Sequence, residues 1–158
     1  MGCTTAGVTS RAFEAVLYRR RRRGKALGDL RRALAHKADL EYEAAFREAV
    51  PVEISGATGR NAARINGVYE PTAERRRDRV VYCKRGDGDS WLSLTAFGWM
   101  VQDTEDKEAD NDVGALKCSA SGVLAKAVSP LAVPLATWEV CVGAGPWERQ
   151  VTLRVDRA

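Results

Sequence analysis

Five consecutive arginines and a nearby lysine form the densest group of chemically active side chains in the chain. They are Arg19, Arg20, Arg21, Arg22, Arg23 and Lys25. Guanidinium groups pair well with phosphate oxygens, so this Arg run suits nucleic acid or an anionic membrane surface. Adjacent guanidinium groups also repel one another, which favours the plainer interpretation of a solvated helix end. We keep sequence-nonspecific polyanion binding as one of two candidate functions.

Residues for catalysis and metal binding are scarce. His36 is the single histidine, and it lies far along the sequence from any candidate nucleophile. The cysteines, at positions 3, 83, 118 and 141, lack the paired C-x-x-C spacing of a zinc or redox site. We therefore predict no catalytic residue, no metal site and no cofactor, with reduced cysteines. A single disulfide among positions 83, 118 and 141 is the alternative.

Carboxylates are plentiful but do not follow the spacing of a calcium-binding loop. The Asp87–Asp89 segment reads Asp-Gly-Asp, which favours a tight turn over weak ion binding. Residues 103–112 carry six carboxylates and one lysine. We expect this second segment to be a solvated loop.

Aromatic side chains recur in two similar segments. Trp91 and Trp99 flank one candidate hairpin, and Trp138 and Trp147 flank another. Aromatics of this size are what a small core needs, so we predict that the four tryptophans anchor one core, with an aromatic binding face as the alternative. The full set of core or interaction aromatics is Tyr69, Tyr82, Trp91, Trp99, Trp138 and Trp147.

Short β-rich runs after Pro51 must position these aromatics. Turn-forming residues separate the runs, which is typical of a small antiparallel domain. The predicted strands are Val52–Ser55, Arg64–Glu70, Arg79–Arg85, Trp91–Leu94, Trp99–Asp103, Val113–Ser119, Thr137–Val142 and Val151–Asp156. The last run alternates apolar and polar residues most clearly.

Helical spacing dominates before Pro51. Apolar residues recur at intervals of three and four, which predicts a helix from Ser10 and a second helix beyond a break at Gly24. The first 50 residues hold 11 Lys and Arg against 6 Asp and Glu. We predict residues 1–50 as a basic helical arm and residues 51–158 as an antiparallel β-domain of about six to eight short strands. The fold class is mainly β with a helical arm (α+β).

The β-domain carries a recognisable order of motifs. Ile65–Glu70 reads INGVYE, Val81–Asp87 reads VYCKRGD, and later come WL at 91, GWMV at 98, WEV at 138 and WERQ at 147. This order resembles a small Trp-rich β-module that is repeated in proteins of dinoflagellates and other protists. The resemblance covers roughly residues 51–156 but not the Arg75–Arg77 run, where a more Gly- or Asn-like turn is expected. It implies an accessory role and supplies no catalytic residues.

These observations favour a non-enzymatic accessory or protein-interaction module with an unidentified protein partner. Polyanion binding through residues 19–25 is the alternative. No apolar run is long enough to span a bilayer and no secretory signal is evident, so we expect an intracellular, cytoplasmic protein. Two alternatives stay open at the N-terminus: an organellar transit segment, because Glu14 is the only acid before position 29, and lipidation at Gly2 or Cys3.

Overall fold

The computed structural model describes residues 6–118, 127, 129–143 and 146–158. Side chains of the first helix are described from Tyr18 onward, except those of Arg19 and Arg21. The predicted lipidation positions Gly2 and Cys3 lie outside the described residues. The chain divides into two compact units, residues 1–40 and residues 41–158.

One long helix, α1 (Ala6–Arg47), replaces the two predicted helices. It begins before Ser10 and runs through Gly24 without a break, so both of those predictions are wrong. A glycine inside a helix costs only about 1 kcal/mol relative to alanine. The alanines, leucines and arginines around Gly24 are strong helix formers and outweigh that cost.

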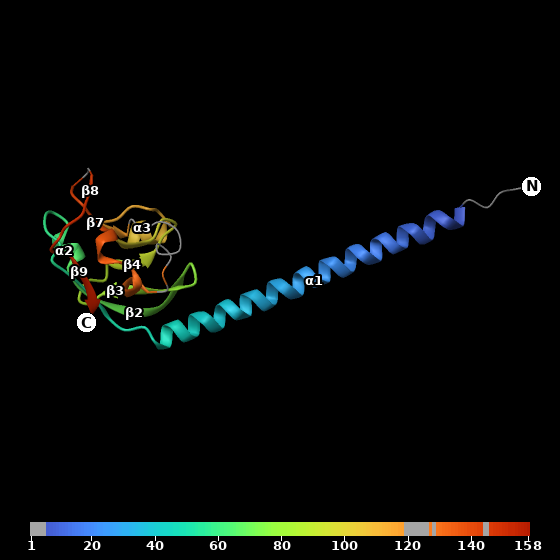
Figure 1. Cartoon of the computed structure of the whole chain (residues 1–158), viewed down its shortest axis with the longest axis horizontal. Coiled ribbons are helices and arrows are strands. Elements are labelled where there is room, and N and C mark those ends of the chain that lie inside the picture. The colour runs from blue at the N-terminus through green and yellow to red at the C-terminus, as the bar shows by residue number, and fades with distance from the viewer. Residues whose placement is uncertain (1–5, 119–126, 128, 144–145) are drawn as a thin grey trace, which may run out of the picture. The chain divides into compact units, whose positions relative to one another are not determined.

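The β-domain is a curled antiparallel sheet, which confirms the α+β fold class. Figure 1 shows the strands curling around a shared interior. The nine strands among the described residues lie in the spatial order β8-β7-β6-β5-β4-β3-β2-β1-β9. Their bounds are β1 (Val52–Ser55), β2 (Gly67–Arg76), β3 (Arg79–Lys84), β4 (Trp91–Leu94), β5 (Trp99–Gln102), β6 (Leu116–Cys118), β7 (Trp138–Cys141), β8 (Trp147–Glu148) and β9 (Arg154–Arg157).

Short helical segments connect some of these strands. They are α2 (Ala62–Ile65), α3 (Thr104–Glu108) and the 3-10 turns η2 (Pro130–Ala132) and η3 (Leu135–Thr137). Segment 103–112, which was predicted to be a solvated loop, instead contains the short helix α3. Asp103 caps this helix, because its carboxylate accepts a hydrogen bond from the backbone N–H of Asp106 at 2.8 Å.

Polar contacts join the two ends of the curled sheet. The side chain of Asn61, which follows β1, donates to the carbonyl of Cys141 in β7 at 2.7 Å. The backbone N–H of Thr58 donates to the side-chain carbonyl of Gln150 at 2.7 Å. The segment after β1 therefore contacts β7 and the residues that follow β8.

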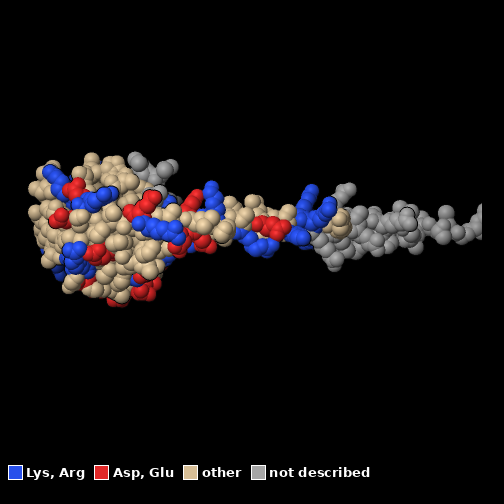
Figure 2. Space-filling view, turned by 90° about the horizontal axis from the view of Figure 1, so that it is seen from below, with Lys and Arg blue, Asp and Glu red and all other residues tan. Residues whose placement is uncertain are grey.

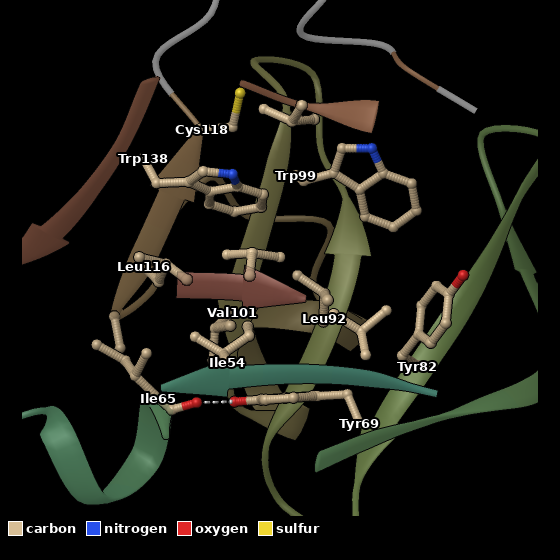
Figure 3. Close-up of a cluster of buried hydrophobic side chains, with 14 of the residues drawn as sticks. Ile54, Ile65, Tyr69, Tyr82, Leu92, Trp99, Val101, Leu116, Cys118 and Trp138 are labelled. Atoms are coloured by element: carbon tan, nitrogen blue, oxygen red, sulfur yellow. Dashed lines mark hydrogen bonds between the residues drawn. The ribbon is translucent and has the colours of Figure 1, made fainter. Parts of the chain in front are cut away.

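The concave face of the sheet encloses the core. Figure 3 shows Trp99 and Trp138 on either side of Val101, with Leu92 and Leu116 nearby. Both indole rings are at most 1% exposed. Alternation along paired strands explains the arrangement, because Leu92 lies opposite Val101 and Leu116 opposite Val140.

Tyr69 lies on the floor of this core and is fully buried. Its hydroxyl donates to the carbonyls of Arg64 and Ile65, both at 2.9 Å, and Figure 3 shows the second of these bonds. Burial raises the pKa of Tyr69 far above the ordinary tyrosine value. The ring therefore stays neutral and holds α2 against the sheet.

Candidate functional site

The continuity of α1 places basic and apolar residues on a single line. Arg20, Arg23, Leu27, Leu30 and Leu34 follow one another at intervals of three and four residues, which keeps them on one helix face. The three leucines are 56–57% exposed. We call these five residues the α1 line. An exposed leucine row of this kind is typical of a helix that docks on another surface.

The C-terminal end of α1 belongs to the β-domain. Tyr42 is 8% exposed, and its hydroxyl donates to the carbonyls of Ala73 and Glu74 in β2. The ring stacks with Phe46 at 6.2 Å between centroids, and the Arg75 guanidinium lies 5.0 Å from the Tyr42 ring centre. The sequence places Tyr42 and Phe46 on the predicted second helix, which was expected to be solvated on most sides, and their spacing of four was the usable signal for a packed face.

The Arg run is exposed wherever its side chains are described. Arg20, Arg22, Arg23 and Lys25 all face solvent, and the Arg22 guanidinium lies 5.2 Å from the ring centre of Tyr18. The side chains of Arg19 and Arg21 lie outside the described residues. Figure 2 shows blue side chains gathered on the part of α1 next to the grey atoms. The described part of the run is therefore exposed to solvent.

The predicted aromatics divide between the two faces of the sheet. Tyr69, Tyr82, Trp99 and Trp138 lie in the core. Trp91 and Trp147 are only half-buried, so the prediction that all four tryptophans anchor the core is wrong for these two. The cause is strand alternation, because Trp91 pairs with Gln102 and Trp147 with Cys141, residues of the opposite face.

A lysine covers each outward tryptophan. The ammonium of Lys107 lies 4.3 Å from the Trp91 ring centre, and that of Lys117 lies 4.4 Å from the Trp147 ring centre. Cation–π contacts of this length are favourable by about 0.5–2 kcal/mol. The two rings are therefore not open platforms for a ligand, which argues against the aromatic binding face.

A charged hollow of about 390 Å³ opens beside the β2–β3 turn. Its lining is of mixed sign, with four cations and three carboxylates, and consists of Glu74, Arg75, Arg76, Arg77, Lys107, Glu108 and Asp110. The ammonium of Lys107 donates to both Glu74 oxygens, at 2.7 and 2.8 Å, and lies 2.9 Å from Glu108. Burial opposes the charge of Lys107, but these two carboxylates raise its pKa above the ordinary lysine value. Lys107 is therefore a structural cation and unsuited to act as a nucleophile.

Arg76 is the best-anchored group of the hollow. Its guanidinium donates to the Ser93 hydroxyl and the Gln102 side-chain carbonyl, both at 3.0 Å. It also pairs with Asp110, whose pKa is held below the usual range chiefly by the hydrogen bond from Arg76. The Asp110 carboxylate also accepts a hydrogen bond from the Arg77 guanidinium at 2.9 Å. Each arginine and lysine that lines the hollow has a carboxylate partner. Three of these ion pairs hold the segment around α3 against the β2–β3 hairpin.

The β2–β3 turn is strained. Arg77 and Asp78 have φ values of +50° and +60°, the left-handed region that a two-residue hairpin turn demands. Gly, Asn and Asp suit this turn, whereas an arginine at position 77 costs about 1–2 kcal/mol.

Replacing Arg77→Asn and Asp78→Gly together is expected to raise the free energy of unfolding by about 1 kcal/mol. Relief of backbone strain exceeds the loss of two exposed ion pairs, with Asp110 and Arg75, which contribute little. Urea unfolding of the full chain measures the change. An unchanged or lower midpoint would show that the ion pairs outweigh the strain.

The remaining candidates for chemistry do not converge. His36 is exposed on α1, Cys83 and Cys141 carry free thiols, and the Cys118 sulfur lies 3.7 Å from the Thr137 hydroxyl. The described ranges contain no group of three or more His, Cys, Asp or Glu side chains that could hold a metal ion. The Asp87–Asp89 turn is confirmed, because the Asp87 carboxylate accepts the Asp89 N–H at 3.1 Å and the Ser90 hydroxyl at 2.8 Å. The first of these bonds is the main reason that the pKa of Asp87 is lowered.

Within the residues that the structure covers, none of the helices combines the length and the apolar character needed to cross a bilayer.

Comparisons of the chain with protein-family models, curated proteins and solved structures find no match.

Proposed function

We propose that this chain is a non-enzymatic protein-interaction module and that α1 is its docking element. The observation that carries the proposal is the row of exposed leucines, Leu27, Leu30 and Leu34, on one face of a long helix. An isolated helix gains little stability in water and usually depends on packing of its apolar face. An amphipathic helix seated in an apolar groove is a common mode of recognition.

An intracellular, cytoplasmic location belongs to the same proposal. Cys83 and Cys141 hold free thiols, which suits a reducing compartment. The order of tryptophan motifs in the β-domain supports an accessory role but identifies no partner.

Photo-crosslinking in the cells that make the protein tests the docking role. A benzoylphenylalanine at position 30 lies on the leucine row, whereas the same group at position 18 lies on the opposite face, because nine residues separate Tyr18 from Leu27. Tyr18 is 58% exposed, so the two sites match in accessibility. We expect discrete adducts from position 30 only. No discrete adduct, or equal labelling from both positions, would contradict the proposal.

Polyanion binding by the Arg run is the second candidate function. It is favoured by the exposure of Arg20, Arg22, Arg23 and Lys25 together with the scarcity of acids before residue 29. Such binding releases condensed counterions and would not distinguish between sequences.

Replacing Arg20, Arg21 and Arg22 by Gln is expected to weaken binding to duplex DNA or anionic vesicles. For DNA, the slope of log affinity against log salt should become shallower by about 0.9 per lost phosphate contact. Fluorescence titration at several salt concentrations measures the slope. A matched control replaces Arg31, Arg32 and Lys37 by Gln, removing the same charge further along α1. Equal effects of both triple variants would show that net charge matters and the run does not.

A further inference from the structure

We propose that the partner seated on the α1 line is the α1 helix of a second copy of this chain, running antiparallel. The inference rests on the proposed docking role of α1 and names the partner. The supporting observation is the order of charged residues before and after the leucines. These residues share one helix face because α1 continues through Gly24.

The line continues beyond the leucines at the same spacing. Arg20 and Arg23 precede Leu27, and Lys37 and Glu41 occupy the next two positions after Leu34. All four charged side chains are exposed. Read along α1, the line is therefore basic first and apolar in the middle, and it ends in a lysine followed by the acid Glu41. Apolar residues at alternating intervals of three and four are the pattern by which two helices pair along a seam.

Charge complementarity sets the orientation. In a parallel pair, Arg20 and Arg23 of one helix would face the same residues of the other, and like charges at close range repel. In an antiparallel pair, the register that sets Leu30 opposite Leu34 of the second copy sets Arg23 opposite Glu41. The same register sets Leu27 opposite Lys37, whose apolar stem can cover the leucine while its ammonium reaches water.

The nearby charges agree with this orientation. Residues 19–25 hold six cations and no acid, whereas Asp39, Glu41 and Glu43 lie near the other end of the helix, with Glu41 on the leucine face and the other two acids on the far side of α1. Antiparallel pairing lays the basic segment of each copy along the acidic segment of the other. Charged residues flanking an apolar seam commonly decide which helices pair and in which direction.

Sedimentation equilibrium of the full chain tests the pairing. The wild type is expected to show a monomer–dimer equilibrium between roughly 1 and 300 µM. Leu30→Glu places a carboxylate in the seam and should weaken dimerisation at least about tenfold. Tyr18→Glu introduces the same charge on the opposite face, at similar exposure, and should leave the equilibrium unchanged. A wild type that stays monomeric at the highest concentration overturns the inference.

Charge exchange tests the orientation. Arg23→Glu and Glu41→Arg should each weaken the dimer about tenfold, because each turns two attractive cross-pairs into repulsive ones. The double variant restores the pairing with the signs exchanged and should recover most of the affinity. In a parallel dimer position 23 faces itself, so the single variants would keep a like-charge contact and the double variant would rescue nothing. Failure of rescue overturns the antiparallel arrangement.

The crosslinking at position 30 separates failure of this inference from failure of the docking role. An adduct of twice the chain mass supports self-pairing. A monomeric wild type together with a discrete adduct of another mass overturns self-pairing and leaves the docking role standing. A monomeric wild type with no adduct overturns both.

Discussion

Trp138→Ala is expected to lower the free energy of unfolding by about 3–5 kcal/mol, the range for removing a large aromatic from a packed core. Trp138 is 1% exposed and shares the concave face with Val140, as the alternation of their strand predicts. The neighbouring strand adds Leu116 and Cys118 to the same face, so the truncated side chain would leave a cavity that several elements line. Chemical denaturation of the full chain measures the loss.

Trp147→Ala supplies the matched control in the same hairpin. Its ring is half-buried on the outer face beneath Lys117, so its loss should cost about 1 kcal/mol, the size of one cation–π contact with modest burial. Comparable losses at positions 138 and 147 would contradict the division of the tryptophans between two faces.

Removal of residues 1–50 is expected to reduce stability more than removal of residues 1–40. Fragment 41–158 retains Tyr42 and Phe46, whereas fragment 51–158 loses both, together with the two hydrogen bonds of the Tyr42 hydroxyl. Burial of these rings suggests a difference of about 3 kcal/mol in the free energy of unfolding.

Thermal and urea unfolding of the two fragments tests this expectation. Fragment 41–158 should unfold cooperatively with the midpoint of the full chain. Fragment 51–158, which the sequence predicts to fold alone, should unfold cooperatively at a lower midpoint. Equal midpoints would show that Tyr42 is incidental to the core, and a non-cooperative transition would show that the β-domain cannot fold from residue 51.

Strands whose apolar and polar residues alternate could be predicted from the sequence, but their ends could be predicted only in part. β1 and β4 have the predicted bounds, and β3 is shorter by one residue. The clearest pattern, from Val151, extends beyond the observed strand, since β9 starts at Arg154 and Val151 is 91% exposed. Alternation shows which residues could share a face, but the partner strand decides how far the ladder runs.

The predicted strand Arg64–Glu70 illustrates a competing local structure. Its first residues form α2, and β2 starts only at Gly67 and extends to Arg76. Two hydrogen bonds from the Tyr69 hydroxyl hold the end of α2, and they require a buried tyrosine that periodicity alone does not reveal. Tertiary contacts here override the extended preference of the sequence.

The charged hollow could not be predicted, because its pairs are distant in the sequence. Lys107 meets Glu74 and Arg76 meets Asp110 only when α3 lies beside the β2–β3 hairpin. The α1 line was partly visible, since the leucine spacing was evident. A break at Gly24 would have separated Arg20 and Arg23 from the leucines, so the continuous line depends on the structure.

Amide hydrogen exchange along α1 tests most directly the claim that this helix is available for docking. Peptides from residues 20–40 should exchange far faster than peptides from β4, β5 and β7 in dilute protein, because an unpacked helix frays while core strands exchange mainly through global unfolding. Their exchange should slow as the protein concentration rises or a partner binds. Protection of residues 20–40 equal to that of the core strands in dilute, monomeric protein would show that the leucines are covered within their own chain, and the docking role of α1 would be contradicted.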